Sequence, residues 1–233
     1  MRSQRIQQIL NQVRGLNSDE AEQVLITTIE ESSREVAELQ TQLSKVYLHK
    51  ALNVKKERKI FLNKALDAVN NSIRIDKTPE ALAVKCRVLG HIIMCNGLSY
   101  DSVVKAIEVK QTMDKLEEMD SQHVELPLIR GLLYYHASSP NWFLKQLLKR
   151  LCGTKLKELI SGASHKKALA SLQKYTKDSM EWNYAMANCQ RKLKNNERAV
   201  FHYEKMKQIA VNNMFEEELV AKAREKLAAR KKW

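Results

Sequence analysis

Glycine and proline are scarce in this chain, whose 233 residues contain six Gly and three Pro. Sheets need tight turns and long loops need residues that break regular structure, and these two residues supply most of both. No window shows sustained alternation of apolar and polar residues, whereas apolar residues recur at helical spacing throughout. The sequence therefore predicts an all-α chain of long helices joined by short connections.

Start and stop signals divide the chain into helices. Thr78 is a cap residue followed by Pro79 at the first helical position, which is a strong start signal. A long helix from Ser18 toward Leu52 is expected to break around Ser32. Over residues 55–76 we expect one shared apolar side, formed by Ile60, Leu62, Ala65, Leu66, Val69 and Ile73. Helices are also predicted over 3–14, 99–119, 125–137, 141–153, 164–176, 179–194, 197–211 and 216–233.

The predicted helices pair into repeats. In the tetratricopeptide pattern, small residues let two helices approach closely and an aromatic residue fills the groove beside them, in a unit of about 34 residues. The best copy is "WNYAMANCQRKLKNNERAVFHYEKM". Ala187 takes the small position of its first helix, and Ala199, Tyr203 and Met206 give A-x3-Y-x2-M on its second. We expect helical-hairpin repeats of tetratricopeptide type.

An earlier copy is interrupted by an insertion. Gly131 and Tyr134 mark its first helix, but the A-x3-L-x2-Y set of its second helix arrives roughly 25 residues late. That set consists of Ala168, Leu172 and Tyr175. The stretch "NWFLKQLLKRLCG" occupies the gap, so we predict an inserted helix within residues 141–163 of the third repeat. A weaker copy contains Ala65, Val69 and Ser72, and a further one with poor register covers 79–119.

The inserted helix is predicted to be amphipathic. One face carries leucines that we expect to pack against the neighbouring repeat, namely Leu144, Leu147, Leu148 and Leu151. Trp142 begins the helix away from that face and is expected to cover an adjacent helix. Lys145, Lys149 and Arg150 lie away from the leucines. The insertion would therefore display positive charge on its outer side.

Three parts are expected along the chain. Residues 1–33 form an N-terminal helical extension, 34–213 the tetratricopeptide-like repeats wound into a right-handed superhelix, and 214–233 a C-terminal basic helix. The extension either docks on the first repeat or pairs with another copy. The repeat groove is expected to receive a helix or extended peptide from a partner protein.

Positive charge dominates the chain and is unevenly distributed. Its 40 Lys+Arg and 27 Asp+Glu give a net charge of +13. Residues 1–54 hold six basic and seven acidic residues, so the excess lies entirely beyond them. A field of this sign attracts polyanions such as nucleic acid, an anionic membrane or an acidic protein surface. The alternative interpretation is a lysine-rich surface that only maintains solubility.

Basic residues gather in the insertion and around the last hairpin turn. Together they form the candidate binding surface: Lys145, Lys149, Arg150, Lys155, Lys157, Lys166, Lys167, Lys174, Arg191, Lys192 and Lys194. Glu158 is the single acidic residue between Lys145 and Lys174. In the C-terminal helix, Lys222, Lys226 and Arg230 share one stripe, for which a solvated face is an equally good interpretation.

No motif of the sequence indicates an enzyme, a cofactor or a metal. A phosphate-binding loop, a nucleophile elbow and a zinc-protease motif do not occur. His91 and Cys95 share a helix with Cys86, but no fourth ligand follows at suitable spacing, so we expect packed core residues. The four Cys are widely spaced and no secretory signal or membrane-spanning run occurs, which favours a reduced cytoplasmic protein.

Three stretches resemble the regulator of microtubule dynamics family: "IRGLLYYHASSPNWFLKQLLKRLCG", "HKKALASLQKY" and "NYAMANCQRKLKNNERAVFHYEKM". Members are similar in carrying a Gly-containing helix, an insertion begun by Trp and ended by Gly, and two terminal tetratricopeptide-like helix pairs. The resemblance covers residues 35–228. It implies a short member that binds microtubules and acts at the spindle in chromosome segregation, because the membrane anchor of other members does not occur.

The leading hypothesis is a non-enzymatic protein whose basic surface binds the dense acidic tails of tubulin. A nucleic-acid-binding repeat protein is a less favoured alternative, because aromatic residues make up 6% of the chain and none interleave with the basic clusters. A lipid-handling or membrane-contact module, with helices enclosing an apolar cavity, is the other alternative.

Overall fold

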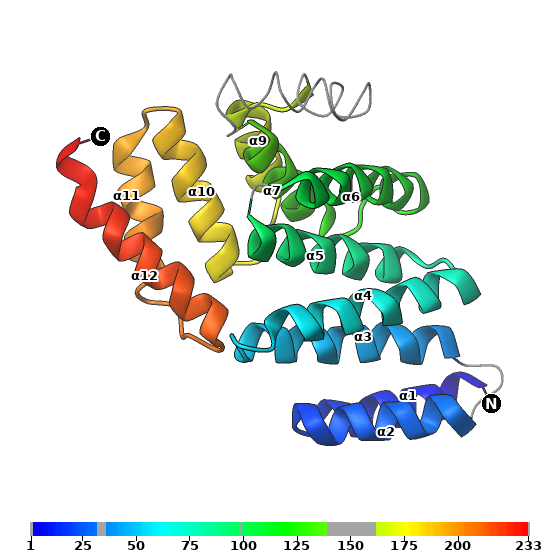
Figure 1. Cartoon of the computed structure of the whole chain (residues 1–233). Coiled ribbons are helices and arrows are strands. Elements are labelled where there is room, and N and C mark those ends of the chain that lie inside the picture. Colours follow the sequence, from blue (N-terminus) through cyan, green and yellow to red (C-terminus); the bar gives the residue numbers. More distant parts are fainter. Residues whose placement is uncertain (1, 32–35, 98, 139–161, 233) are drawn as a thin grey trace. The chain divides into compact units, whose positions relative to one another are not determined.

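The computed structural model describes residues 2–31, 36–97, 99–138 and 162–232, and all regular secondary structure within these ranges is helical (Figure 1). The prediction of an all-α chain is confirmed. The chain forms two compact units, which we call unit 1 (Met1–Leu98) and unit 2 (Ser99–Trp233). The predicted insertion at 141–163, including Trp142 and its leucines, lies almost wholly outside the described residues.

Unit 1 is a succession of helices that pack on their neighbours in the sequence. These are α1 (Arg2–Arg14), α2 (Ser18–Glu31), α3 (Val36–Asn53), α4 (Arg58–Ile75) and α5 (Pro79–Asn96). The Thr78 hydroxyl accepts a hydrogen bond from the backbone N–H of Ala81, with Pro79 in the first turn, so the predicted start of α5 is confirmed.

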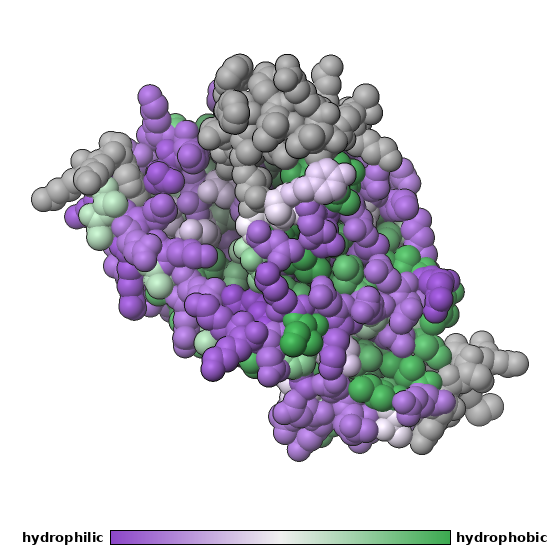
Figure 2. All heavy atoms as spheres, viewed as in Figure 1, coloured by the Kyte–Doolittle hydropathy of each residue, from purple (hydrophilic) through white to green (hydrophobic). Residues whose placement is uncertain are grey.

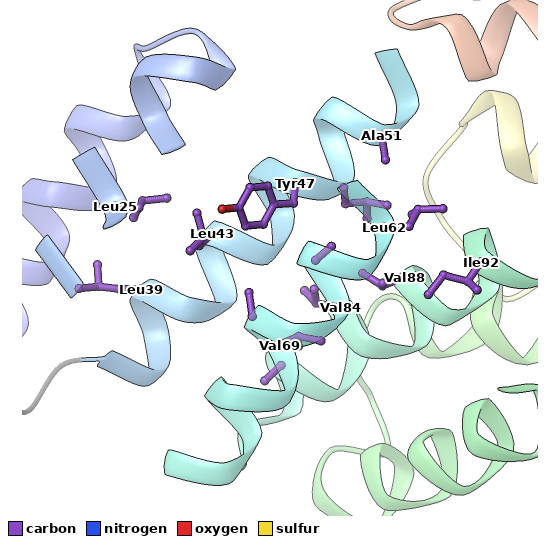
Figure 3. Packing of buried hydrophobic residues seen from close by; sticks show 14 residues of the cluster. Leu25, Leu39, Leu43, Tyr47, Ala51, Leu62, Val69, Val84, Val88 and Ile92 are labelled. Carbon is purple, nitrogen blue, oxygen red and sulfur yellow. The ribbon is translucent and has the colours of Figure 1, made fainter. Parts of the chain in front are cut away.

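The core of unit 1 runs continuously from α2 to α5 (Figure 3). Leu25 of α2 meets Leu39 and Leu43 of α3, and Val69 of α4 faces Val84 of α5. Small residues bring α3 and α4 close together. The Ser44 hydroxyl donates a hydrogen bond to the Ala65 carbonyl at 2.7 Å, and the hydroxyls of Thr41 and Ser72 are 2.7 Å apart. The small positions predicted at Ala65 and Ser72 are therefore confirmed.

One predicted core position in unit 1 is wrong. Ile60 is 57% exposed, whereas Leu62, Ala65 and Val69 of the same helix are buried. At about 100° per residue, Ile60 lies about 180° around the helix from Val69. It therefore belongs to the opposite side of α4.

Ion pairs add to the apolar contact between α2 and α3. The Lys50 ammonium of α3 lies 2.5 Å from an Asp19 carboxylate oxygen and also pairs with Glu22, both from α2. Burial of Lys50 opposes its charge, but the hydrogen bonds that its ammonium donates to both carboxylates outweigh this effect and raise its pKa. Burial and a hydrogen bond with Glu22 raise the pKa of Tyr47 to about 12. Helix α2 thus docks on α3, and α1 packs on α2, which agrees with the first of the two arrangements considered for the N-terminal extension.

Unit 2 contains α6 (Tyr100–Met119), α7 (Leu126–Ser138), α9 (His165–Leu172), α10 (Met180–Lys192), α11 (Asn196–Lys205) and α12 (Met214–Ala228), followed by a 3-10 helix (Ala229–Lys232). Helix α7 packs on α9, α9 on α10, and α10 on α11 and α12. Several of these helices start with a serine or asparagine whose side chain accepts a backbone N–H.

The best sequence repeat forms the α10–α11 hairpin. Ala187, Ala199, Tyr203 and Met206 are fully buried, so the predicted small and aromatic positions are confirmed. The Tyr203 hydroxyl donates to the Asn188 side-chain oxygen at 3.0 Å, which satisfies a polar group inside the hairpin.

Candidate basic binding surface

The helix that carries the basic residues Lys166 and Lys167 is positioned by a close approach of backbones. A Cβ added to Gly131 of α7 would lie 2.5 Å from Leu172 Cγ and 3.3 Å from the Ala168 carbonyl oxygen of α9. Only glycine leaves room for this contact. The late second helix of the interrupted repeat therefore does pair with the helix of Gly131, as the sequence pattern predicts.

Hydrogen bonds at both ends fix the direction of α9. The Ser171 hydroxyl donates to the Pro127 carbonyl at 2.9 Å, and the Ser138 hydroxyl lies 2.8 Å from His165 Nδ1. Helices α7 and α9 are therefore antiparallel. The Trp182 indole N–H of α10 donates to the Leu172 carbonyl at 2.8 Å, so α10 runs back along α9.

This arrangement brings the start of α9 and the α10–α11 turn to the same end of unit 2 (Figure 1). We call this the basic end. Its candidate residues come from both elements: Lys166, Lys167, Arg191, Lys192 and Lys194. Two basic clusters that are separated in the sequence thus share one region of the unit. Figure 2 shows mainly hydrophilic atoms over α10, α11 and α12.

The lysines of the basic end are exposed. In the part of the chain that the structure describes, no carboxylate lies within ion-pair distance of Lys166, Lys167, Lys192 or Lys194. Lys167 Nζ donates to the Gly162 carbonyl at 2.9 Å, and its backbone N–H is bound by the Ser164 hydroxyl. The first turn of α9 contains no acidic residue.

Lys194 adopts a backbone conformation that usually requires glycine. Its φ is 63°, and it follows the C-cap of α10 at Leu193. The Asn195 N–H donates to the Gln190 carbonyl at 2.9 Å and the Lys194 N–H to Arg191 at 3.0 Å, which is the Schellman pattern. A lysine here carries a conformational cost that glycine would avoid.

Two candidate residues differ from the others. Lys174 follows the end of α9 and is exposed, but it lies one helix length from Lys166, at the opposite end of the hairpin. Arg191 is half-buried beside Tyr203; burial raises the pKa of that phenol, and the Arg191 charge opposes the rise. Lys145, Lys149, Arg150, Lys155 and Lys157 lie outside the described residues.

The whole net charge of the chain is accounted for by its C-terminal part. Residues 126–233 hold 22 Lys+Arg and 9 Asp+Glu, a net of +13, while residues 1–125 hold 18 of each. In α12, Lys222 is exposed and Lys226 half-exposed, and the 3-10 helix that follows carries Arg230. The stripe predicted for one α-helix therefore continues into a different helix type.

The described residues contain no cluster of side chains that could hold a metal ion. No group of three or more His, Cys, Asp or Glu side chains within them converges on a point. His91 is buried, and burial together with Arg87 and Arg58 lowers its pKa to about 3, so the ring is neutral at physiological pH. Among the helices described, none combines the length and apolarity needed to cross a bilayer.

Comparisons with known proteins place the chain in a family. A comparison with curated proteins gives no match. A tetratricopeptide repeat protein from Parabacteroides merdae ATCC 43184 is similar at 14% identity over 94% of this chain and 97% of that chain, with a TM-score of 0.29. The family model of regulator of microtubule dynamics protein 1-3 matches residues 4–231, nearly the whole sequence. The chain therefore belongs to the regulator of microtubule dynamics protein 1-3 family.

Proposed function

We propose that this chain is a non-enzymatic, cytoplasmic protein that binds microtubules through the basic end of unit 2 and acts on the cytoskeleton and the spindle. The family to which it belongs is described as regulators of microtubule dynamics. Its net charge of +13 has the sign needed to attract the acidic tails of tubulin.

The observation that carries the proposal is the position of Lys166 and Lys167. Both occupy the first turn of α9, where the partial positive charge of the helix N-terminus opposes cations. Acidic residues would stabilise this turn, yet it contains none. Residues that cost folding energy at an exposed position are expected to be retained for binding.

The mechanism needs no pocket. Flexible acidic tails contact several lysines weakly, and the contacts add because each neutralises charge without demanding a fixed geometry. Exposed ion pairs of this kind are screened by salt. Binding that bridges neighbouring tubulin subunits would change how readily they are lost from the polymer end.

Cosedimentation with assembled microtubules tests the proposal. The protein should pellet with intact microtubules, and the bound fraction should fall when the acidic tails are removed by protease and again as salt is raised. Equal binding with and without the tails would refute the acidic-tail mechanism.

A pair of double variants makes the test specific. Lys192→Glu with Lys194→Glu should weaken pelleting, whereas Arg74→Glu with Lys77→Glu should change it much less. Both variants alter the net charge equally, and Arg74 and Lys77 are exposed residues of unit 1. If the two variants lose the same affinity, net charge rather than the basic end determines binding.

A further inference from the structure

The exposed Ile60 belongs to a second basic segment that the microtubule proposal does not use. Residues 54–60, "VKKERKI", connect α3 to α4 and are called here the α3–α4 turn. They contain four Lys or Arg and one Glu. Val54 is 39% exposed and Ile60 57% exposed, while Lys56 and Lys59 are also exposed. The charge run is visible in the sequence, but the exposure of its aliphatic residues is not.

The backbone of this turn is fixed from within unit 1. The Val54 N–H donates to the Lys50 carbonyl at 3.0 Å, and Arg58 Nε donates to the Ala51 carbonyl at 3.1 Å, so Arg58 helps to cap the end of α3. The lysine and aliphatic side chains are displayed outward by this frame. Figure 2 shows a small hydrophobic spot surrounded by hydrophilic atoms over the first turns of α4.

Lys59 and Ile60 are poorly suited to their positions in the fold. Lys59 lies in the first turn of α4, which contains no acidic residue, and the helix dipole disfavours a cation there. Ile60 is β-branched, which lowers helix propensity, and leaves more than half of its surface in water. Cations and exposed aliphatic residues together are the combination that an anionic lipid surface takes up.

We propose that the α3–α4 turn docks on the surface of an anionic membrane. Lys56 and Lys59 contact lipid phosphates and carboxylates, while Val54 and Ile60 enter the boundary between headgroups and acyl chains. The turn has no aromatic residue for base stacking. Arg58, the residue suited to bidentate phosphate recognition, is engaged with the Ala51 carbonyl. These two facts favour a lipid surface over a nucleic acid.

Flotation of the full chain with vesicles tests this proposal. The protein should float with vesicles of phosphatidylcholine and phosphatidylserine, and much less with phosphatidylcholine alone. Replacing Lys56 and Lys59 by Gln should weaken binding about fivefold for each lysine. Ile60→Ser should weaken it severalfold at every salt concentration, because the contribution of an aliphatic side chain is not screened.

The opposite end of α4 supplies matched controls. Ile75 is 51% exposed, and Arg74 and Lys77 lie beside it and are also exposed. Ile75→Ser removes the same aliphatic side chain, and Arg74→Gln with Lys77→Gln removes the same number of positive charges, at the other end of α4. These variants should leave vesicle binding unchanged. Circular dichroism should be the same for all variants, since the changed side chains are exposed.

Three outcomes would overturn the proposal. The first is equal flotation with the two vesicle types. The second is an equal loss of vesicle binding in the Ile60→Ser and Ile75→Ser variants. The third is loss of RNA binding, with unchanged flotation, when Lys56 and Lys59 are replaced. Microtubule pelleting of the Ile60→Ser variant should remain normal, so failure here is distinguishable from failure of the proposed function.

Discussion

Lysine has opposite roles at the α2–α3 contact of unit 1 and at the start of α9 in unit 2. Lys50 is 8% exposed and pairs with two carboxylates of α2. Lys166 and Lys167 are exposed, in a helix turn without an acidic residue. The first arrangement uses the charge to hold helices together. The second leaves the charge available to a ligand, at a small cost to the helix.

The two helix contacts are also built differently. Ion pairs with Asp19 and Glu22 supplement the apolar contact of α2 with α3. The contact between α7 and α9 depends on shape, because Gly131 lets Leu172 approach the backbone. The lysines of α9 take no part in this contact, and the Lys167 ammonium donates only to the nearby Gly162 carbonyl. The four predictions that follow test this difference.

The largest effect is expected for Lys50→Met. Removing the ammonium leaves the partly buried Glu22 with only the Tyr47 hydroxyl and the Lys64 ammonium, 4.0 Å away, as partners. The loss of the closer ion pair should lower the free energy of unfolding by about 3 kcal/mol in urea titrations. Lys45 pairs with Glu80 at 2.6 Å but is far more exposed, so Lys45→Met should cost less than about 1 kcal/mol. Similar losses in both variants would show that Lys50 is not a structural lysine.

Gly131→Ala should destabilise unit 2 by about 2 kcal/mol, because the added methyl group overlaps Leu172 and forces α9 away. Gly90 of α5 is the matched control, since no atom of another described helix lies within 4 Å of the position that an added methyl group would occupy. Gly90→Ala should stabilise the chain by about 0.5–1 kcal/mol through helix propensity. Thermal unfolding followed by circular dichroism distinguishes the expected destabilisation by Gly131→Ala from the expected stabilisation by Gly90→Ala. A neutral Gly131→Ala would mean that α9 does not depend on this approach.

Lys166→Glu with Lys167→Glu should raise the free energy of unfolding by about 1 kcal/mol, because acidic residues complement the start of α9. The same double variant should pellet less with microtubules at low salt. Opposite signs for stability and binding are the signature of residues retained for a ligand. If the variant loses both stability and microtubule binding, these lysines stabilise the fold, as Lys50 does.

The smallest effect is expected for Lys194→Gly. Glycine adopts a φ of 63° without the strain of a Cβ, so the variant should gain about 0.5–1 kcal/mol in urea unfolding. Lys192→Gly, at the end of α10, should instead lose up to about 1 kcal/mol. Both variants remove one positive charge from the basic end. A difference in microtubule binding between them would therefore show that the position of each lysine matters, in addition to its charge.

Local patterns predicted the helices and hairpins well. Ala187, Ala199 and Tyr203 pack as their spacing indicates, because close packing within one hairpin depends on residues near in sequence. Thr78 and Pro79 mark the start of α5 because capping involves only the first turn. The pairing of Gly131 with Ala168 was also predictable, even across the long gap, since both residues are needed for the same close contact.

The arrangement of charges was less predictable. Lys166 and Lys174 are close in sequence, yet they lie at opposite ends of an eight-residue helix. Lys166 and Lys192 are distant in sequence, yet antiparallel packing brings them to one end. A count of cations along the chain cannot separate these cases, because the outcome depends on helix direction. The ion pairs of Lys50 are not predictable from the sequence around it, because its partners Asp19 and Glu22 belong to another helix.

The 2.8 Å contact between the Ser138 hydroxyl and His165 Nδ1 has a consequence for the chain between them. It holds together the two ends of the chain segment 139–164. Closing a loop costs only about 0.6 kcal/mol more for each doubling of its length. A change in the length of residues 139–164 should therefore cost little folding free energy, because contacts between α7 and α9 hold the two ends of the segment together.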